Sequence, residues 1–130
     1  MSFTLTITAQ PEDIDELGHV NNAVWVRWLQ DVGVGHWRAH ATSEQIERYV
    51  WVVTRHEIDY RGNLRAGESV EARTWVGAPH GARFDRFVEF VRERRVLVSA
   101  KTTWAVIERA SGRLVRVPPD VAERFPPGPI

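Results

Sequence analysis

The sequence predicts an α+β fold in which an antiparallel sheet of about five strands curves around one long central helix. Two observations lead to this prediction. The first is the order of the segments: one strand pattern, one long apolar helix pattern, then a run of strand patterns joined by short turns. The second is that consecutive strands with short connections pair as an antiparallel meander, whose apolar face must be covered. Only one helix is long enough to cover it, so we expect the sheet to wrap around this helix.

The first strand and the helix are predicted from two different hydrophobic periods. Residues 3–9 alternate between apolar side chains and threonines, which indicates a half-buried strand. Residues 22–41 instead carry apolar side chains at the spacing of one helix face. Gly33 and Gly35 each cost about 1 kcal/mol inside a helix, and we expect another backbone to pass close to the helix there. The helix face consists of Trp25, Trp28, Leu29, Val32 and His36.

The remaining strands follow from residue type. After Thr42 and Ser43 the sequence becomes extended in character, with β-branched and aromatic residues separated by glycine-containing breaks. A short strand is expected over residues 113–117, and the tail that follows holds five of the seven prolines and can form at most one helical turn. With no repeat or linker, we expect a single domain over residues 1–130, with 118–130 as a Pro-rich tail. The four longer strands are expected at residues 49–60, 69–76, 84–92 and 96–108.

Composition excludes several classes of function. Seventeen basic and seventeen acidic residues cancel, so the net charge favours neither a nucleic acid nor an anionic membrane as a partner. The chain has no cysteine, which excludes a disulfide scaffold, a Cys-ligated metal site and a thiol nucleophile. The N-terminus does not resemble a secretory signal, and no apolar run approaches the roughly 20 residues that span a bilayer. We therefore expect a cytoplasmic location.

The segment DIDELGHVNN, residues 13–22, concentrates polar side chains directly before the apolar helix. Gly18 permits a tight turn, and Asn21 or Asn22 lies where a helix N-cap belongs. The free N–H groups and positive dipole at a helix start suit a carbonyl oxygen that gains negative charge. An aspartate just upstream could act there as general base or nucleophile, and His19 could add a hydrogen bond. A turn plus a cap would also explain such a loop by itself.

The whole string D-x-D-x-x-G-H-V-N-N, followed by a Trp-rich helix, resembles the hotdog-fold thioesterases of the 4-hydroxybenzoyl-CoA thioesterase and acyl-CoA thioester hydrolase type. The resemblance continues in HEIDYRGNLRAGESVEARTWVG (residues 56–77) and in KTTWAVIERASGRLVRVP (residues 101–118). It covers nearly the full chain, in the expected order, and implies the fold already inferred from periodicity.

The resemblance also implies roles for three residues. The second aspartate of the pair, Asp15 here, is the catalytic carboxylate of that family, and the backbone N–H at the helix start, Asn22 here, polarises the thioester carbonyl. His19 matches the histidine of the related D-x-N-x-H-V-N-N motif of plant acyl-carrier-protein thioesterases, but Leu17 replaces the asparagine of that motif. The implied reaction is hydrolysis of an acyl thioester, in which Asp15 activates water or attacks to form a mixed anhydride. It requires no cofactor and no metal.

The substrate implied by the resemblance is an acyl-CoA, with a fatty or an aryl acyl group. Family members place their active sites between subunits, which implies a homodimer or homotetramer. The candidate substrate-binding residues are Asn21, Tyr60, Arg61, His80 and Arg83. Of these, Arg61, His80 and Arg83 are candidates for contacts to the nucleotide phosphates.

Several alternatives stay open at this point. The substrate could be an acyl-carrier-protein thioester, or the chain could be a non-catalytic module that binds acyl-CoA in the same tunnel. An inactive subunit of a hetero-oligomer is a further alternative, whereas a hotdog dehydratase is disfavoured because its Asp/His pair belongs to a different loop pattern. Trp51, Trp75 and Trp104 lie on predicted strands and could belong to the core, to a subunit interface or to the wall of an acyl pocket.

Overall fold

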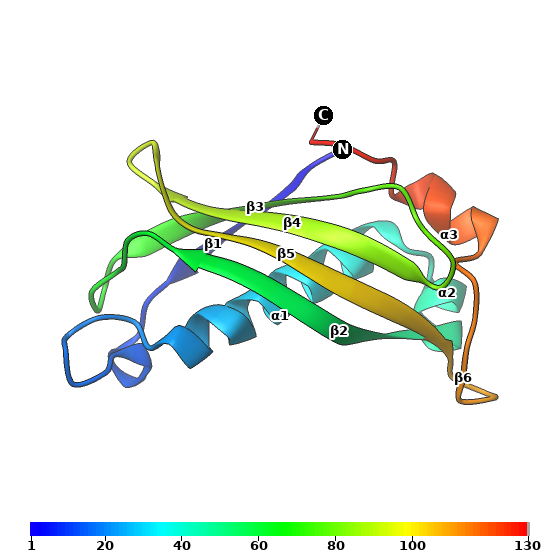
Figure 1. The fold of residues 1–130 in the computed structure, drawn as a ribbon, viewed down its shortest axis with the longest axis horizontal. Helices are drawn as coiled ribbons and strands as arrows, with labels where there is room; N and C mark the ends of the chain where they lie inside the picture. Colours follow the sequence, from blue (N-terminus) through cyan, green and yellow to red (C-terminus); the bar gives the residue numbers. More distant parts are fainter. Residues whose placement is uncertain (130) are drawn as a thin grey trace.

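The computed structural model describes residues 1–129 and has the predicted hotdog fold, in which a curved antiparallel sheet wraps around α1 (Figure 1). The strand order is β1-β3-β4-β5-β2, and β6 pairs with β5. No helix in the described part of the chain is long and apolar enough to cross a membrane. The elements are β1 (Phe3–Thr8), a 3-10 turn (Pro11–Asp13), α1 (Asn22–His40), α2 (Ser43–Arg48), β2 (Tyr49–Tyr60), β3 (Ser69–Val76), β4 (Arg83–Arg92), β5 (Arg95–Glu108), β6 (Arg113–Leu114) and α3 (Pro119–Arg124).

The space between α1 and the sheet contains two apolar clusters. The first surrounds the N-terminal half of α1, where Trp25 packs edge-on against Phe90 of β4 at 5.1 Å between ring centroids. The second cluster joins the start of β2 and β4 to α3 and includes Phe84 and Phe125. A buried polar layer separates the two clusters, because Arg86 lies between Phe84 and Phe90 on the inward face of β4. This layer consists of His36, Thr74, Arg86 and Thr102.

The sheet register defines two ends of the molecule. Among residues 1–129, strand β2 pairs only with β5, so its other side is a free edge of the sheet. Val52 of β2 lies opposite Ala105, which in turn lies opposite Arg83 of β4. At the other end Tyr60 lies opposite Val98 of β5. We call these the Tyr49 end and the Tyr60 end of β2, and the start of α1 lies at the Tyr60 end (Figure 1).

Three predictions about the shorter elements are wrong. The segment after Thr42 is not extended but forms α2, which begins with a reciprocal cap: Gln45 N donates to Thr42 Oγ1 (3.1 Å) and Thr42 N donates to Gln45 Oε1 (2.9 Å). The proline-rich tail forms the six-residue helix α3 rather than one turn, because Val121 is completely buried and anchors it to the second cluster. Strand β6 is limited to two residues.

The predicted reason for the helix glycines is also wrong. A Cβ on Gly33 would lie 2.9 Å from Cζ2 of Trp104 and 3.4 Å from Nε of Arg86. A Cβ on Gly35 would meet the ring of Phe3 at 3.5 Å. Large side chains of the sheet, rather than another backbone, therefore approach α1 at both glycines.

The β4–β5 hairpin closes on two residues with left-handed backbone conformations. Glu93 has φ 51° and Arg94 has φ 65°, and both are exposed at the tip of the turn. Two central residues with positive φ are typical of a type I′ hairpin, which favours Asn and Gly rather than Glu and Arg. The paired positions of the two strands therefore hold this hairpin together in spite of its turn residues.

Candidate active site

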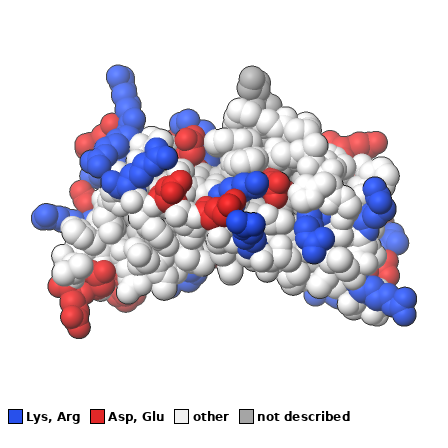
Figure 2. Space-filling model, in the orientation of Figure 1, with Lys and Arg blue, Asp and Glu red and all other residues white. Residues whose placement is uncertain are grey.

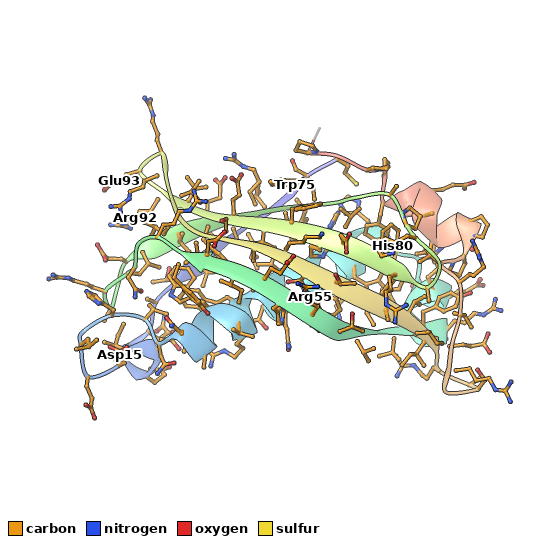
Figure 3. All side chains as sticks on the ribbon, viewed as in Figure 1. Asp15, Arg55, Trp75, His80, Arg92 and Glu93 are labelled. Carbon is orange, nitrogen blue, oxygen red and sulfur yellow. The ribbon has the colours of Figure 1, made fainter. Side chains whose placement is uncertain are left out.

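Residues 13–22, which we call the motif loop, form a loop at the Tyr60 end that backbone hydrogen bonds close. Asp15 N donates to His19 O at 2.8 Å, and Asn21 N donates to Asp13 O at 3.0 Å. Gly18 takes a φ of 81° at the tip, a conformation that glycine adopts without strain. The loop extends beyond the sheet, and Asp15 lies on it at the left of Figure 3.

The first aspartate of the motif has a structural role. The Asp13 side chain is buried, and its two oxygens accept hydrogen bonds from Gln10 N and from Nη2 of Arg27, each at 2.9 Å. This pairing satisfies the carboxylate and ties the motif loop to the first turns of α1. Asp13 therefore positions the loop and has no free oxygen to offer a substrate.

The second aspartate is held differently. One oxygen of Asp15, Oδ1, accepts hydrogen bonds from Leu17 N (2.9 Å) and His19 N (3.4 Å). The other oxygen, Oδ2, accepts none from residues 1–129, and Asp15 is only half-buried. The loop backbone thus orients the carboxylate through one oxygen and leaves the other available for a proton or an electrophile. The His19 side chain is exposed beside it.

The start of α1 has the predicted capping arrangement. Asn21 is the N-cap, and its Oδ1 accepts a hydrogen bond from Ala23 N at 2.9 Å. The next N–H, that of Asn22, donates to no atom in the part of the chain that the structure describes. A free N–H at the positive end of a 19-residue helix is a suitable donor for a developing oxyanion.

Strand β2 brings Tyr60 to the same place. Its hydroxyl donates to Asn22 O at 3.3 Å, and burial raises the pKa of this phenol, so it stays protonated at neutral pH. Arg61 follows with an exposed side chain, while its backbone N–H donates to Leu97 O at 2.8 Å. Five predicted residues therefore come together at the Tyr60 end: Asp15, His19, Asn21, Asn22 and Tyr60, with Arg61 next to them.

The break after β2 contributes a contact that sequence reasoning missed. Asn63 Nδ2 donates to Val20 O at 3.4 Å, and Val20 N donates to Leu64 O at 3.1 Å. These bonds fasten the end of the motif loop to the connection between β2 and β3. In the sequence, Gly62-Asn63 carries only the signal of a turn, because its partner is more than forty residues away.

His80 and Arg83 do not join the others within one chain. His80 N donates to Arg83 O at 2.8 Å, and His80 Nε2 lies 3.4 Å from Oδ2 of Asp85. Arg83 belongs to the Tyr49 end by the sheet register, and Figure 3 places His80 far from Asp15 along the sheet. A site that contains both groups would need a second subunit.

Surface charge adds little to the site. Figure 2 shows basic and acidic side chains interspersed over the visible sheet face, with acidic groups at the end that carries the motif loop. Among residues 1–129 no group of three or more His, Asp or Glu side chains could hold a metal ion. The motif loop and the start of α1 together present one carboxylate, one free backbone N–H and their hydrogen-bonding neighbours.

Several proteins with a similar sequence or fold are named as thioesterases. The acyl-[acyl-carrier-protein] hydrolase FATB3 of Cuphea viscosissima, a chloroplast protein, is 27% identical over 89 residues, which are 66% of this chain and 22% of that protein. The chain spans about a quarter of the length of the curated relatives it matches.

Many solved structures share the fold, including the following two. A predicted thioesterase from Bacillus stearothermophilus superposes with a TM-score of 0.84 at 20% identity, covering 98% of this chain and 99% of that one. A thioesterase from Thermus thermophilus, solved with coenzyme A and Zn, superposes with a TM-score of 0.82 at 20% identity, covering 94% and 90%. The family model of the thioesterase-like superfamily matches residues 9–125, so this chain belongs to the thioesterase-like superfamily.

Proposed function

We propose that this chain hydrolyses an acyl-CoA thioester at the motif loop. The observation that carries the proposal is the arrangement of Asp15 and Asn22: a carboxylate with one free oxygen lies on a loop that ends at a helix start with one free N–H. These are the two groups that acyl transfer needs, one to deliver the nucleophile and one to bind the oxyanion.

The reaction would run in the following way. The thioester carbonyl oxygen accepts a hydrogen bond from Asn22 N, which stabilises negative charge as the carbonyl carbon becomes tetrahedral. Asp15 Oδ2 either takes a proton from the attacking water or attacks the carbonyl carbon itself to form a mixed anhydride that water then cleaves. In both cases the C–S bond breaks, the thiolate gains a proton, and a carboxylic acid and free thiol leave.

The neighbouring residues would support this centre. Tyr60 holds the backbone of Asn22 in place through its hydroxyl, and Asn21 fixes the first turn of α1 as its N-cap. His19, exposed next to Asp15, would position water or the substrate thioester. We propose that the exposed guanidinium of Arg61, next to Tyr60, binds a phosphate of the nucleotide.

Two carriers of the thiol are supported by the similar proteins. The Thermus thermophilus thioesterase with this fold was solved with coenzyme A, which supports an acyl-CoA. The relative from Cuphea viscosissima is named as a hydrolase of acyl-carrier-protein thioesters, which supports the alternative carrier. We propose CoA as the carrier and keep acyl-carrier protein as the second candidate.

We further propose a homodimer whose subunits pair along the free edges of β2. Antiparallel pairing about a two-fold axis would set the Tyr60 end of one subunit beside the Tyr49 end of its partner. It would also satisfy the N–H and C=O groups that an unpaired edge leaves exposed. This arrangement would bring a partner's His80 and Arg83 toward the motif loop, so the substrate would bind between subunits. The single domain over residues 1–130 and the cytoplasmic location stay predictions.

Thiol release from a panel of acyl-CoA esters (short, medium, long and aryl) tests the proposal. We expect activity on one class, and we expect Asp15→Asn to lower kcat by about a hundredfold or more while the fold is retained. Glu16→Gln is the matched control, because Glu16 is an exposed carboxylate of the same loop and should leave activity unchanged.

Each other outcome has a definite meaning. Full activity of a folded Asp15→Asn variant would refute the role of Asp15. An inactive wild type on every CoA ester, with activity on acyl-carrier-protein thioesters, would replace CoA by the carrier protein. Binding of acyl-CoA without any thiol release would identify a non-catalytic binding module.

A further inference from the structure

A cavity of about 180 Å³ lies between the C-terminal half of α1 and the sheet, away from the motif loop. Its walls are largely aromatic and include Trp37, Trp51, Phe84 and Trp104. An apolar protein cavity of about 150 Å³ accommodates a benzene molecule. This cavity, which we call the Arg86 cavity after the cation in its wall, therefore has room for one aromatic ring with a small substituent.

Arg86 is a buried cation without an anionic partner. Its Nη1 donates to Nδ1 of His36 at 2.9 Å and to Oγ1 of Thr74 at 3.0 Å, and no described acidic side chain pairs with it. Burial lowers the pKa of Arg86 to about 10, so it stays charged at neutral pH. Burial, followed by the charge of Arg86, lowers the pKa of His36 to about 3, so the imidazole is neutral.

One edge of the Arg86 guanidinium is unused. Nε is buried and donates to no atom of residues 1–129, and Nη2 likewise has no acceptor there. Gly33 lies directly over this edge, and a Cβ at that position would be 3.4 Å from Nε. The N–H groups of Nε and Nη2 are parallel, which is the geometry that binds both oxygens of a carboxylate at once.

The rest of the wall favours an anion as well. Arg38 and Arg109 line the same cavity, and its lining contains no Asp or Glu. The indole nitrogens of Trp51 and Trp104 are buried donors without an acceptor among the described residues. A wall with three cations and aromatic surface is suited to a compact organic anion.

We propose that the Arg86 cavity binds a carboxylate carried on an apolar body of about the size of a benzene ring. The carboxylate would accept hydrogen bonds from Nε and Nη2 of Arg86, and the ring would pack among the tryptophans. A buried, unpaired charge is costly in a folded protein, and a bound carboxylate would offset that cost.

The cavity is separate from the motif loop of its own chain. Gly33 follows Asn22 by eleven residues on α1, a distance of about 17 Å at 1.5 Å per residue. A benzene-sized ligand next to Gly33 therefore does not reach Asp15 of the same chain. The carboxylate could belong to a free acid, or to the acyl group of a thioester that reacts at a partner's motif loop.

Titration with benzoate and with benzamide, followed by calorimetry and by tryptophan fluorescence, tests the proposal. Both probes have the same ring, but only benzoate carries a charge. We expect saturable binding of benzoate that is tighter than that of benzamide by about tenfold or more, because the bidentate contact is charge-assisted. Equal binding of the two probes, or no binding of benzoate, would overturn the proposal.

Four variants locate the bound carboxylate. Arg86→Met should abolish the preference for benzoate, whereas Arg116→Met, the same change at an exposed arginine outside the cavity, should keep it. If Arg86→Met fails to fold, Arg86→Lys serves instead, since it keeps a cation at this position but lacks the parallel N–H groups of Nε and Nη2. Asp15→Asn should bind benzoate as the wild type does. Benzoate binding that depends on Asp15 and not on Arg86 would place the ligand at the motif loop and refute the assignment.

Hydrolysis assays distinguish the two sources of the carboxylate, and this part of the test rests on the proposed function. If the source is the acyl group, Arg86→Met should raise KM for para-carboxybenzoyl-CoA by about tenfold or more relative to benzoyl-CoA. If the source is a free acid, Arg86→Met should abolish benzoate binding and change both KM values equally. A wild type that binds benzoate but releases no thiol would refute the proposed function and leave the cavity assignment intact.

Discussion

Lowering the pH should destabilise the fold through His36. This side chain is completely buried, and burial, followed by the charge of Arg86, lowers its pKa from 6.5 to about 3. Between these two values the unfolded chain binds a proton that the native chain does not, so the free energy of unfolding falls as the pH falls. The contribution is complete above pH 6.5 and is lost progressively as the pH approaches 3.

The magnitude follows from the size of the shift. A pH of about 4.5 is about two units below the pKa of His36 in the unfolded chain, and each unit changes the free energy of unfolding by about 1.36 kcal/mol. The loss of unfolding free energy from His36 alone, relative to about pH 7.5, is therefore about 2.7 kcal/mol. This is a large part of the stability of a small domain.

Urea unfolding at these two pH values, at one protein concentration, measures the effect. In His36→Gln the amide oxygen can still accept the hydrogen bond from Arg86, but the side chain cannot titrate. We expect the wild type to lose about 2.7 kcal/mol more than this variant between the two conditions. His19→Gln, which removes an exposed imidazole, should behave as the wild type does. Equal losses in the wild type and in His36→Gln would show that His36 accepts a proton without unfolding.

Two further changes test the packing described above. Asp13→Ala should lower the free energy of unfolding by about 1–3 kcal/mol, because Gln10 N loses its acceptor. Arg27→Met should lower it by less, because that arginine is largely exposed. Urea unfolding compares the two variants, and a larger loss in Arg27→Met would contradict the structural role of Asp13. Phe125→Ala should cost about 3–5 kcal/mol, since the ring is buried in the second cluster. An unchanged melting temperature of Phe125→Ala would mean that α3 does not anchor there.

The long elements could be predicted because their signals are local. Alternation of apolar side chains and threonines identifies β1, runs of β-branched and aromatic residues identify the other main strands, and the helical spacing from Trp25 to His36 identifies α1. Helices α2 and α3 have six residues each, too few for a hydrophobic period to be seen. The pair Thr42 and Gln45 does carry a capping signal, and that signal could have revealed α2.

Some features of the candidate site could likewise be predicted from neighbouring residues, and others could not. The cap at Asn21 and the position of Asp15 before a helix follow from neighbouring residues. The placing of Tyr60 beside Asn22, and of His80 at the opposite end, depends on strand register, which a single sequence does not state. Arg86 was missed although RFDRFVEFVR puts it in phase with Phe84 and Phe90, and a charged residue on an inward face is a signal in itself.

The turn at Glu93 and Arg94 has a practical consequence for anyone who wishes to alter this chain. Both residues are exposed, both have unfavourable backbone angles for their type, and the paired strands on either side hold the hairpin without help from the turn. Insertions are tolerated best at such exposed loop tips. A longer, relaxed connection placed between these residues, such as a peptide tag, a fluorophore site or new chain ends, would relieve the backbone that the natural turn constrains. Because Arg95 Nη2 donates to Arg61 O and Tyr60 pairs with Val98, such an addition would lie at the same end of the sheet as the motif loop.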